Sequence, residues 1–299
     1  MSNFNLAVAH VWEYDEDFVS LIEEVLQASN ITTYRVTDYN IKAVTKDVRD
    51  RKLSFDFYLD RASDVDERFS ELAKILTRRK TKIFNPYKKV QHAIDKASMH
   101  LEFITAGLNV PHSIIIPPHS QIEDIYLSVE ELKILGRPFI IKPCNNTGGG
   151  IGVITGAESL KEVIEGRGVY SDDKYLLQEK IYPVFIDKQR AWFRCFFAFG
   201  KSIPVWWDDL THIYQPFEFF NTKLYKKLLQ MTKKIAFLTS LDFFSTEIVL
   251  TQNDRYIVID YVNDQCDMRL KSKHFDGVPD ECVKEIIECL KDYILKSLK

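Results

Sequence analysis

The sequence has few of the features that mark secreted or membrane-bound proteins. Its five cysteines are scattered, odd in number and without a CxxC pair, which argues against a disulfide framework and a thiolate zinc site. No apolar run reaches the roughly 18 residues that a membrane span needs, and no basic segment precedes the short apolar run near the start. We therefore expect a cytoplasmic protein with no membrane partner.

The sequence also lacks an excess of one charge. Its 40 basic and 43 acidic residues are mixed along the chain and leave a net charge of -3. A broad electrostatic surface for nucleic acid is not expected from this pattern, so small-molecule partners are favoured. The 299 residues, 45% of them hydrophobic, can bury a large core and form two or three lobes.

Glycine is scarce as well, with 11 in the chain, yet four fall within five positions of the stretch IIKPCNNTGGGIGVI at 140–154. Glycine backbone can approach an anion closely and donate N–H groups to it, while Lys142 at the end of the preceding apolar run adds a positive charge. The spacing does not match a Walker A loop. These residues alone leave two interpretations open, a phosphate-binding loop and a flexible hairpin.

The pattern of apolar residues predicts a mixed fold. In the first 86 residues, short apolar runs alternate with segments of helical spacing, which predicts a parallel sheet covered by helices. From 137 onward strands dominate, and the turns GK and QND between neighbouring runs indicate antiparallel hairpins. Two amphipathic helices are expected at 221–241 and 279–299. We therefore expect an α/β lobe followed by α+β structure.

Acidic residues mark the ends of two neighbouring strands late in the chain. Glu247 lies in the run STEIVL, and Asp260 and Asn263 lie at the end of the next run, in VIDYVND. Adjacent antiparallel strands can place Glu247 beside Asp260, and two carboxylates with an amide suit Mg²⁺ held between protein and substrate phosphates. The alternative is a solvated strand end.

In this order, these motifs resemble the ATP-grasp superfamily over nearly the full length of the chain. The segments FDFYLDRASD and KIFNPYKKVQHAIDKASMHLEFITAGLNVPHS are similar to those of RimK-type ligases and, less closely, of inositol trisphosphate kinases. The resemblance implies an ATP-grasp fold, with a Rossmann-like pre-ATP-grasp lobe at 1–95 and a lid subdomain at 96–182. A C-terminal core subdomain at 183–299 would complete the clasp around ATP.

The resemblance also implies a set of site residues. It assigns ATP and Mg²⁺ as cofactors, with Mn²⁺ as the alternative ion, and leaves a homodimer open. Phosphate contacts would come from Lys96, Lys142, Gly148, Gly149 and Gly150, and nucleoside contacts from Gln178, Glu179 and Asp187. The metal ligands would be Glu247, Asp260 and Asn263, with Arg194 as the basic residue near the phosphates.

Two features depart from the pattern of the superfamily. Asp260 and Asn263 are separated by two residues where the pattern has one, so either a bulge re-aims Asn263 or Asp264 takes its place. An arginine that stabilises an acyl phosphate is also missing from its usual places. Arg190 or Arg269 could supply that charge by turning toward the γ-phosphate.

Substrate candidates lie after the strands of the first lobe, because ligands gather at the carboxyl ends of parallel strands. Arg61 can hold a carboxylate or phosphate with two hydrogen bonds, the alternative being a surface salt bridge to Asp60 or Asp64. His10 is the second candidate. Cys144, although it lies beside Lys142, is interpreted as a small filler residue.

Three functions remain open at this point. The favoured one is an ATP-dependent ligase that joins a small carboxylate, or a peptide, to an amine through an acyl phosphate. The second is a small-molecule kinase. The third is a nucleotide-binding protein without turnover, which the altered DYVND spacing supports.

Overall fold

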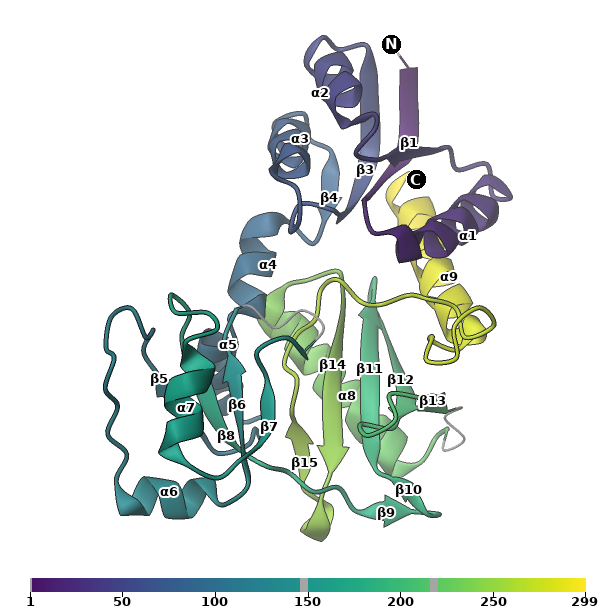
Figure 1. The fold of residues 1–299 in the computed structure, drawn as a ribbon. Coiled ribbons are helices and arrows are strands. Elements are labelled where there is room, and N and C mark those ends of the chain that lie inside the picture. Colours follow the sequence, from purple (N-terminus) through teal and green to yellow (C-terminus); the bar gives the residue numbers. More distant parts are fainter. Residues whose placement is uncertain (1, 146–149, 216–219) are drawn as a thin grey trace. The chain divides into compact units, whose positions relative to one another are not determined.

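A computed structural model of the protein describes residues 2–145, 150–215 and 220–299 (Figure 1). The chain forms two compact units, each assembled from separate segments. Unit 1 consists of Met1–Val90, Arg194–Ser245 and Asp264–Lys299, and unit 2 consists of Gln91–Phe193 and Thr246–Asn263. Within the described ranges, no helix combines the length and the apolar character needed to cross a membrane.

The first part of unit 1 is a parallel sheet with the strand order β2-β1-β3-β4, as the alternating pattern predicts. Residues Leu6 to Ala9 of the first strand are all buried, which is typical of a parallel strand covered on both faces. The strands are β1 (Ser2–His10), β2 (Thr33–Val36), β3 (Leu53–Arg61) and β4 (Lys82–Phe84).

Three amphipathic helices accompany this sheet: α1 (Glu16–Gln27), α2 (Ile41–Arg49) and α3 (Glu67–Arg78). The apolar residues of α2 and α3 share one core cluster with the sheet. Asp66 directly precedes helix α3, and its side chain accepts a hydrogen bond from the backbone N–H of Arg68 and so caps the helix. A further helix, α4 (Tyr87–Ile94), contains the boundary between the two units.

Unit 1 is completed by segments from the second half of the chain. These are β12 (Lys201–Trp207), β13 (Tyr214–Gln215), α8 (Lys223–Thr239) and α9 (Asp280–Ser297). Helix α8 packs on β12, and α9 packs on α1 (Figure 1). The last helix is amphipathic as predicted, and its buried face includes Val283, Ile286, Ile287, Leu290 and Ile294.

A five-stranded sheet has the order β13-β12-β11-β14-β15. The boundary between the units passes through β11 (Trp192–Ala198) and β14 (Phe243–Leu250), so each of these strands contributes residues to both. Strand β15 (Tyr256–Val258) pairs with β14 in the antiparallel hairpin expected around the turn QND.

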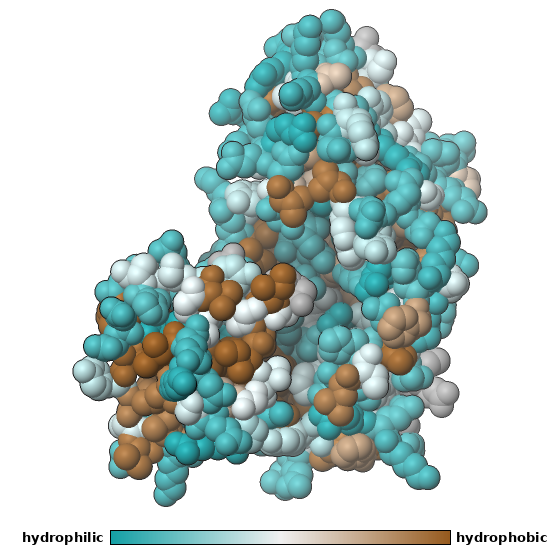
Figure 2. All heavy atoms as spheres, in the orientation of Figure 1, coloured by the Kyte–Doolittle hydropathy of each residue, from teal (hydrophilic) through white to brown (hydrophobic). Residues whose placement is uncertain are grey.

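Unit 2 contains an antiparallel sheet with the order β5-β8-β6-β7, in which β5 is an edge strand. Capping boxes at Ser128 and Ser159 start two of its helices. Apolar side chains are numerous on the surface of this part (Figure 2). Its elements are α5 (Lys96–Thr105), β5 (Ser113–Ile116), α6 (Val129–Leu135), β6 (Phe139–Pro143), β7 (Ile154–Ala157), α7 (Leu160–Arg167) and β8 (Tyr175–Glu179).

A small hairpin in unit 2 does not follow from the sequence pattern. Strands β9 (Phe185–Ile186) and β10 (Gln189–Arg190) are joined by Asp187 and Lys188, with φ values of 46° and 69°. Two successive residues with positive φ are the signature of a tight hairpin turn. Strands of two residues are too short to produce a recognisable alternation of apolar and polar side chains.

Candidate active site

Two lysines and two carboxylates meet in unit 2. Lys96 is the first residue of α5, and its ammonium nitrogen lies 3.8 Å from a carboxylate oxygen of Asp260. Lys142 lies near the end of β6, is only 7% exposed, and donates a hydrogen bond to the carbonyl oxygen of Ile259 at 3.1 Å. Both lysines therefore contact the chain just after β15, where the predicted metal ligands begin.

The buried position of Lys142 changes its titration. Its pKa is lowered to about 8, mainly by burial; Asp260 raises the pKa and Lys96 lowers it within this total. The ammonium group lies 5.5 Å from the centre of the Tyr261 ring, within the range of a cation–π contact. A polyphosphate placed here would favour the charged form of Lys142 and would itself be stabilised by that charge.

A β-bulge lies between the two predicted metal-binding strands. The N–H of Glu247 donates to the carbonyl of Asp260 at 3.0 Å, while the N–H of Ile259 donates to the carbonyl of Glu247 at 2.9 Å. Two residues of one strand thus oppose one residue of the other, which defines a bulge. The bulge includes Asp260, the first residue of the DYVND segment with the unusual spacing.

The carboxylate of Glu247 is suited to bind a magnesium ion that the phosphates of a nucleotide also bind. Glu247 is 7% exposed and accepts a hydrogen bond from the indole N–H of Trp192 at 3.0 Å, which orients its carboxylate. Among the described residues, no three His, Cys, Asp or Glu side chains form a metal cage. Mg²⁺ does not require one, because it binds through one or two carboxylates together with substrate phosphates.

Asp264, the alternative to Asn263, has its charged neighbours within unit 1. Its pKa is raised to about 7, mainly by burial and also by the nearby Asp64, while Arg61 lowers it within this total. Asp264 is therefore easily protonated in this environment, which makes it a poorer candidate for holding a cation than Asp260, whose carboxylate is 37% exposed beside Lys96.

The pair predicted to read the adenine edge ends strand β8. Gln178 is 2% exposed, and its side-chain amide donates to the hydroxyl groups of Ser113 at 3.1 Å and Tyr261 at 3.3 Å. Glu179 accepts a hydrogen bond from the backbone N–H of His112 at 2.8 Å. In the structure, both side chains are thus held by groups at the edge strand and by Tyr261.

Tyr261 and His100 belong to this cluster, although neither is among the residues predicted from the sequence. The Tyr261 hydroxyl lies 2.6 Å from Nδ1 of His100, and burial lowers the pKa of His100 to about 4. A neutral imidazole is therefore present at physiological pH. A signal for both exists in the sequence, since Tyr261 follows Asp260 directly and His100 lies one helical turn after Lys96.

Two further residues not predicted from the sequence, Asp173 and Lys174, connect the helix that begins with Lys96 to the segment that follows Lys142. The carboxylate of Asp173 accepts hydrogen bonds from both the backbone and the side-chain amide of Asn145, each at 2.8 Å. Its neighbour Lys174 donates to the carboxylate of Asp95, at 2.8 Å. Asp95 caps the helix that begins with Lys96, and Asn145 begins the glycine-rich segment, so the dipeptide Asp173-Lys174 anchors both.

The glycine-rich segment is described only in part, because Gly148 and Gly149 lie outside the described residues. Gly150 and Gly152 have φ values of 76° and 78°, a region that disfavours other residues. At Gly152 a Cβ atom would also lie 3.0 Å from the ring of Tyr170. Cys144, at the base of the segment, is fully buried, and burial raises its pKa to about 12, in agreement with a filler role.

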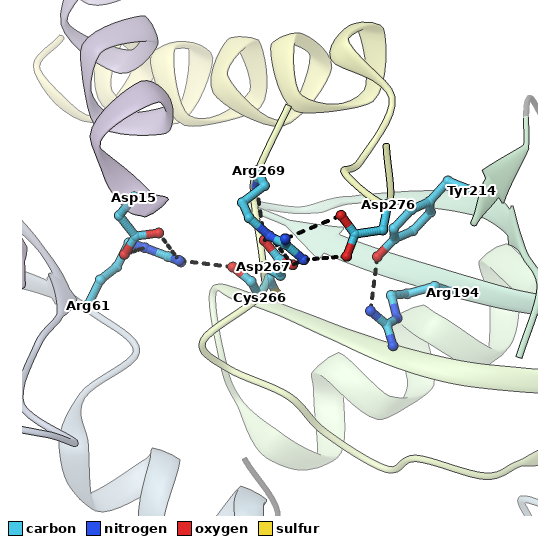
Figure 3. A network of polar contacts seen from close by, with 8 residues as sticks. All are labelled: Asp15, Arg61, Arg194, Tyr214, Cys266, Asp267, Arg269 and Asp276. Atoms are coloured by element: carbon cyan, nitrogen blue, oxygen red, sulfur yellow. Dashed lines mark hydrogen bonds and ion pairs between the residues drawn. The ribbon is translucent and has the colours of Figure 1, made fainter. Parts of the chain in front are cut away.

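The substrate candidates of the first lobe are neighbours in unit 1. His10 and Arg61 are register partners at the ends of the parallel strands β1 and β3. Arg61 binds Asp15 with two hydrogen bonds of 2.6 and 2.9 Å, and it also donates to the carbonyl of Cys266 at 2.9 Å (Figure 3). The expected alternative, a surface salt bridge to Asp60 or Asp64, is wrong: the partner is Asp15, and both side chains are 2% exposed.

Two buried nitrogen atoms in this cluster have no hydrogen-bond partner within the described ranges. They are Nη1 of Arg61 and Nε2 of His10. Burial lowers the pKa of His10, which favours the neutral ring. Buried polar atoms are nearly always paired with protein, water or ligand, so these two nitrogens mark a place where a polar partner fits.

The remaining arginine candidates differ in their surroundings. The guanidinium of Arg194 lies 4.2 Å from the centre of a Trp207 ring and donates to the Tyr214 hydroxyl at 2.9 Å (Figure 3). Arg269 is held by Asp267 at 2.7 Å and Asp276 at 3.0 Å.

Arg190 belongs to the short strand β10, which Asp187 precedes in the hairpin turn.

Comparison with known structures agrees with this architecture: the chain has the ATP-grasp fold. No family model and no curated protein matches the sequence. A RimK-domain ATP-grasp protein from Sphaerobacter thermophilus is 18% identical, with a TM-score of 0.64, covering 97% of this chain and 99% of that chain.

Two further structures of ligases are similar over the whole chain. The D-alanine–D-alanine ligase from Bacillus anthracis, complexed with ATP, is 14% identical with a TM-score of 0.66, covering 99% of this chain and 98% of that one. The ATP-grasp ligase PsnB, complexed with a precursor peptide and AMPPNP, is 15% identical with a TM-score of 0.63, covering 100% and 99%. The fold class expected from the sequence is thus confirmed.

Proposed function

We propose that the protein is an ATP- and magnesium-dependent ligase that joins the carboxylate of a small acid or a peptide to an amine. The observation that carries this proposal is the cluster of Lys96, Lys142, Glu247 and Asp260 in unit 2. Two ammonium groups beside two carboxylates suit a polyphosphate with its divalent cation. The similar solved structures of ATP-grasp ligases support the same class of reaction.

In this proposal Lys96 and Lys142 offset the charge of the triphosphate and keep its γ-phosphoryl group in place. The glycine-rich segment, from Gly148 to Gly150, would donate backbone N–H groups to the same phosphates. Magnesium, held by Glu247, Asp260 and Asn263, would supply further positive charge there. Gln178, Glu179 and Asp187 would contact the nucleoside, with Tyr261 fixing the orientation of Gln178.

The chemistry would proceed in two displacements. A carboxylate oxygen of the acid attacks the γ-phosphorus, the bond to the β–γ bridging oxygen breaks, and ADP leaves. The amine nitrogen then attacks the acyl carbon, the carbon–oxygen bond to phosphate breaks, and inorganic phosphate leaves with a proton released from nitrogen. Preorganised charge, rather than a protein nucleophile, is what such a reaction needs.

Arg61 and His10 are the candidates for binding the acid, because each has a buried nitrogen that still lacks a partner in the described part of unit 1. Arg194 and Arg190 are the candidates for stabilising the acyl phosphate. Arg269 is less suited to this role, because ion pairs with Asp267 and Asp276, in the same segment of the chain, already neutralise its charge.

Phosphorus NMR of the purified protein with Mg-ATP and a pool of amino acids, small dicarboxylates, peptides and polyols tests this function. The ligase predicts ADP and inorganic phosphate growing together only when an acid and an amine are both present. A new phosphoester signal would instead identify a small-molecule kinase. Absence of Mg-ATP binding, measured separately by calorimetry, would reject both enzymes.

The variant Lys142→Ala tests the role of the site. It should abolish phosphate release while the far-ultraviolet circular dichroism stays unchanged. Full turnover in this variant would contradict the phosphate-binding role of Lys142.

A further inference from the structure

The solvent-facing side of helix α8 consists mostly of lysine. The buried side is formed by residues such as Leu228, Met231 and Ile235. The helix contains no aspartate or glutamate, although the whole chain has a net charge of -3. Its exposed residues are Lys223, Lys226, Lys227, Gln230, Lys233, Lys234 and Phe237.

Most of these lysines have no acidic partner among the described residues. Within the described ranges, no carboxylate pairs with Lys226, Lys227, Lys233 or Lys234. Two other exposed lysines of unit 1 do have such partners, Lys201 with Glu285 and Lys273 with Asp17. Like charges one helical turn apart destabilise a helix. Solubility alone does not require lysines to be concentrated on one face of a helix.

The C-terminal end of the lysine face borders a hollow in unit 1. This cavity has a volume of about 440 Å³, and Phe237 at its edge is 83% exposed. Its wall is mainly aromatic and aliphatic, and its acidic member, Asp242, is already bound by Lys82 at 3.1 Å. The lining residues include Phe197, Phe199, Lys233, Phe237, Asp242 and Tyr293.

We propose that the lysine face of α8 and this cavity together form a docking surface for an acidic peptide segment of a partner protein. Carboxylates of the segment lie along the lysines, and one large apolar side chain enters the cavity beside Phe237. Lys233 belongs to both features, so the charged part and the apolar part of the surface are continuous. This role goes beyond the ligase activity and rests on residues of unit 1 alone.

The shape of the surface favours a peptide over other anionic partners. A membrane is bound by apolar residues that project into it, whereas a hollow receives a side chain that projects from the partner. Nucleic acid is also negatively charged, but it offers no flexible apolar side chain to fill an aromatic cavity. Isolated exposed aromatics are common, and the combination of Phe237 with the cavity and the lysine face is what carries the inference.

The test uses the full chain and a short fluorescein-labelled peptide rich in glutamate with one central tryptophan. Fluorescence anisotropy should report saturable binding that weakens as salt is added, because exposed charge pairs are screened. A peptide with alanine in place of tryptophan should bind about tenfold more weakly, as expected for loss of an anchor side chain. Phosphatidylserine vesicles and duplex DNA are measured in parallel.

Two protein variants separate the apolar and charged contributions. Phe237→Ala should weaken binding about tenfold, and the double variant Lys233→Gln with Lys234→Gln should weaken it several-fold and reduce the salt dependence. The matched controls are Phe275→Ala, at a phenylalanine that is 77% exposed, and Lys42→Gln with Lys46→Gln on α2. Both controls should bind the peptide like the unaltered protein.

Three results would overturn the proposal. One is the absence of binding at low ionic strength. Another is binding that Phe237→Ala and the alanine peptide leave unchanged, which would reduce the surface to a non-specific charge patch. The third is tighter binding of the vesicles or the DNA, with the same dependence on Lys233 and Lys234, which would assign the surface to that partner.

Discussion

The ammonium group of Lys142 lies over the ring of Tyr261, 5.5 Å from its centre, and donates a hydrogen bond to the backbone carbonyl of Ile259. Burial removes the ammonium group from water and so disfavours its charged form, which is the main reason that its pKa falls to about 8 despite these two contacts. The charge that would hold a phosphate is therefore sensitive to mildly alkaline conditions.

Nucleotide binding should weaken as the pH rises through about 8. Above that value Lys142 loses its charge, and the affinity for Mg-ATP should fall by up to about tenfold per pH unit. Isothermal titration calorimetry between about pH 7 and about pH 9 measures the effect. The variant Lys142→Met should bind weakly throughout and lack this dependence; an equally steep pH profile in the variant would exclude Lys142 as its cause.

The stability of the unliganded protein should change in the opposite direction. The unfolded chain keeps the proton of Lys142 up to its ordinary pKa of 10.5, whereas the folded protein releases it near 8. Between these values the unfolded state binds more protons, so the contribution of Lys142 to stability rises with pH, by at most about 1.4 kcal/mol per unit. Urea unfolding of the protein and of Lys142→Met at several pH values should reveal this difference.

Asp260→Asn should abolish the magnesium dependence of nucleotide binding. It removes a carboxylate that lies beside Lys96, opposite Glu247. Magnesium titrations monitored by calorimetry at fixed ATP give the readout. Asp254→Asn, at an exposed position in the turn of the same hairpin, is the control and should behave like the original protein. An unchanged titration in Asp260→Asn would remove this residue from the site.

Asp173→Ala should release the start of the glycine-rich segment from its anchor. Two hydrogen bonds from Asn145 to a carboxylate are lost, and hydrogen bonds to charged groups contribute about 1.5–3 kcal/mol each to stability. We expect a lower free energy of unfolding and weaker Mg-ATP binding. The adjacent Asp172 is exposed, so Asp172→Ala is a matched control in which neither quantity should change.

The buried pair of Arg61 and Asp15 should matter more for stability than an exposed pair in the same unit. Arg61→Met leaves Asp15 as a buried charge without its partner, and about 3–5 kcal/mol is the usual cost of such a change. Lys273→Met breaks the exposed pair with Asp17 and should cost less than about 1 kcal/mol. Chemical denaturation compares the free energies of unfolding of the two variants. Similar losses would show that the Arg61–Asp15 pair stabilises the protein no more than an exposed pair does.

The regular elements follow from the sequence because their signals are local. The buried run of β1, the capped helix that begins at Lys96 and the apolar face of α9 depend on residues within a few positions of one another. The antiparallel hairpin of β14 and β15 is equally local. Its bulge at Asp260 can be anticipated only because the spacing to Asn263 departs from a known pattern.

The contacts that connect distant segments do not follow from the sequence. Asp15 binds Arg61 across 46 positions, and Tyr261 reaches His100 across 161. Neither pair has a periodic signature, because register and tertiary packing decide which side chains meet. For the same reason Asp173 looks like any acid in a surface turn until Asn145 is seen beside it.

The last helix has a consequence for the order in which the chain can fold during synthesis. The ring of Tyr293 in α9 contacts Phe57 and Phe84, which lie in the strands made first, and α9 packs on α1. These early elements leave the ribosome long before residues 280–297 exist. The apolar surface that α9 covers in the folded protein therefore stays exposed, or is covered transiently by other groups, until nearly the whole described chain has been translated.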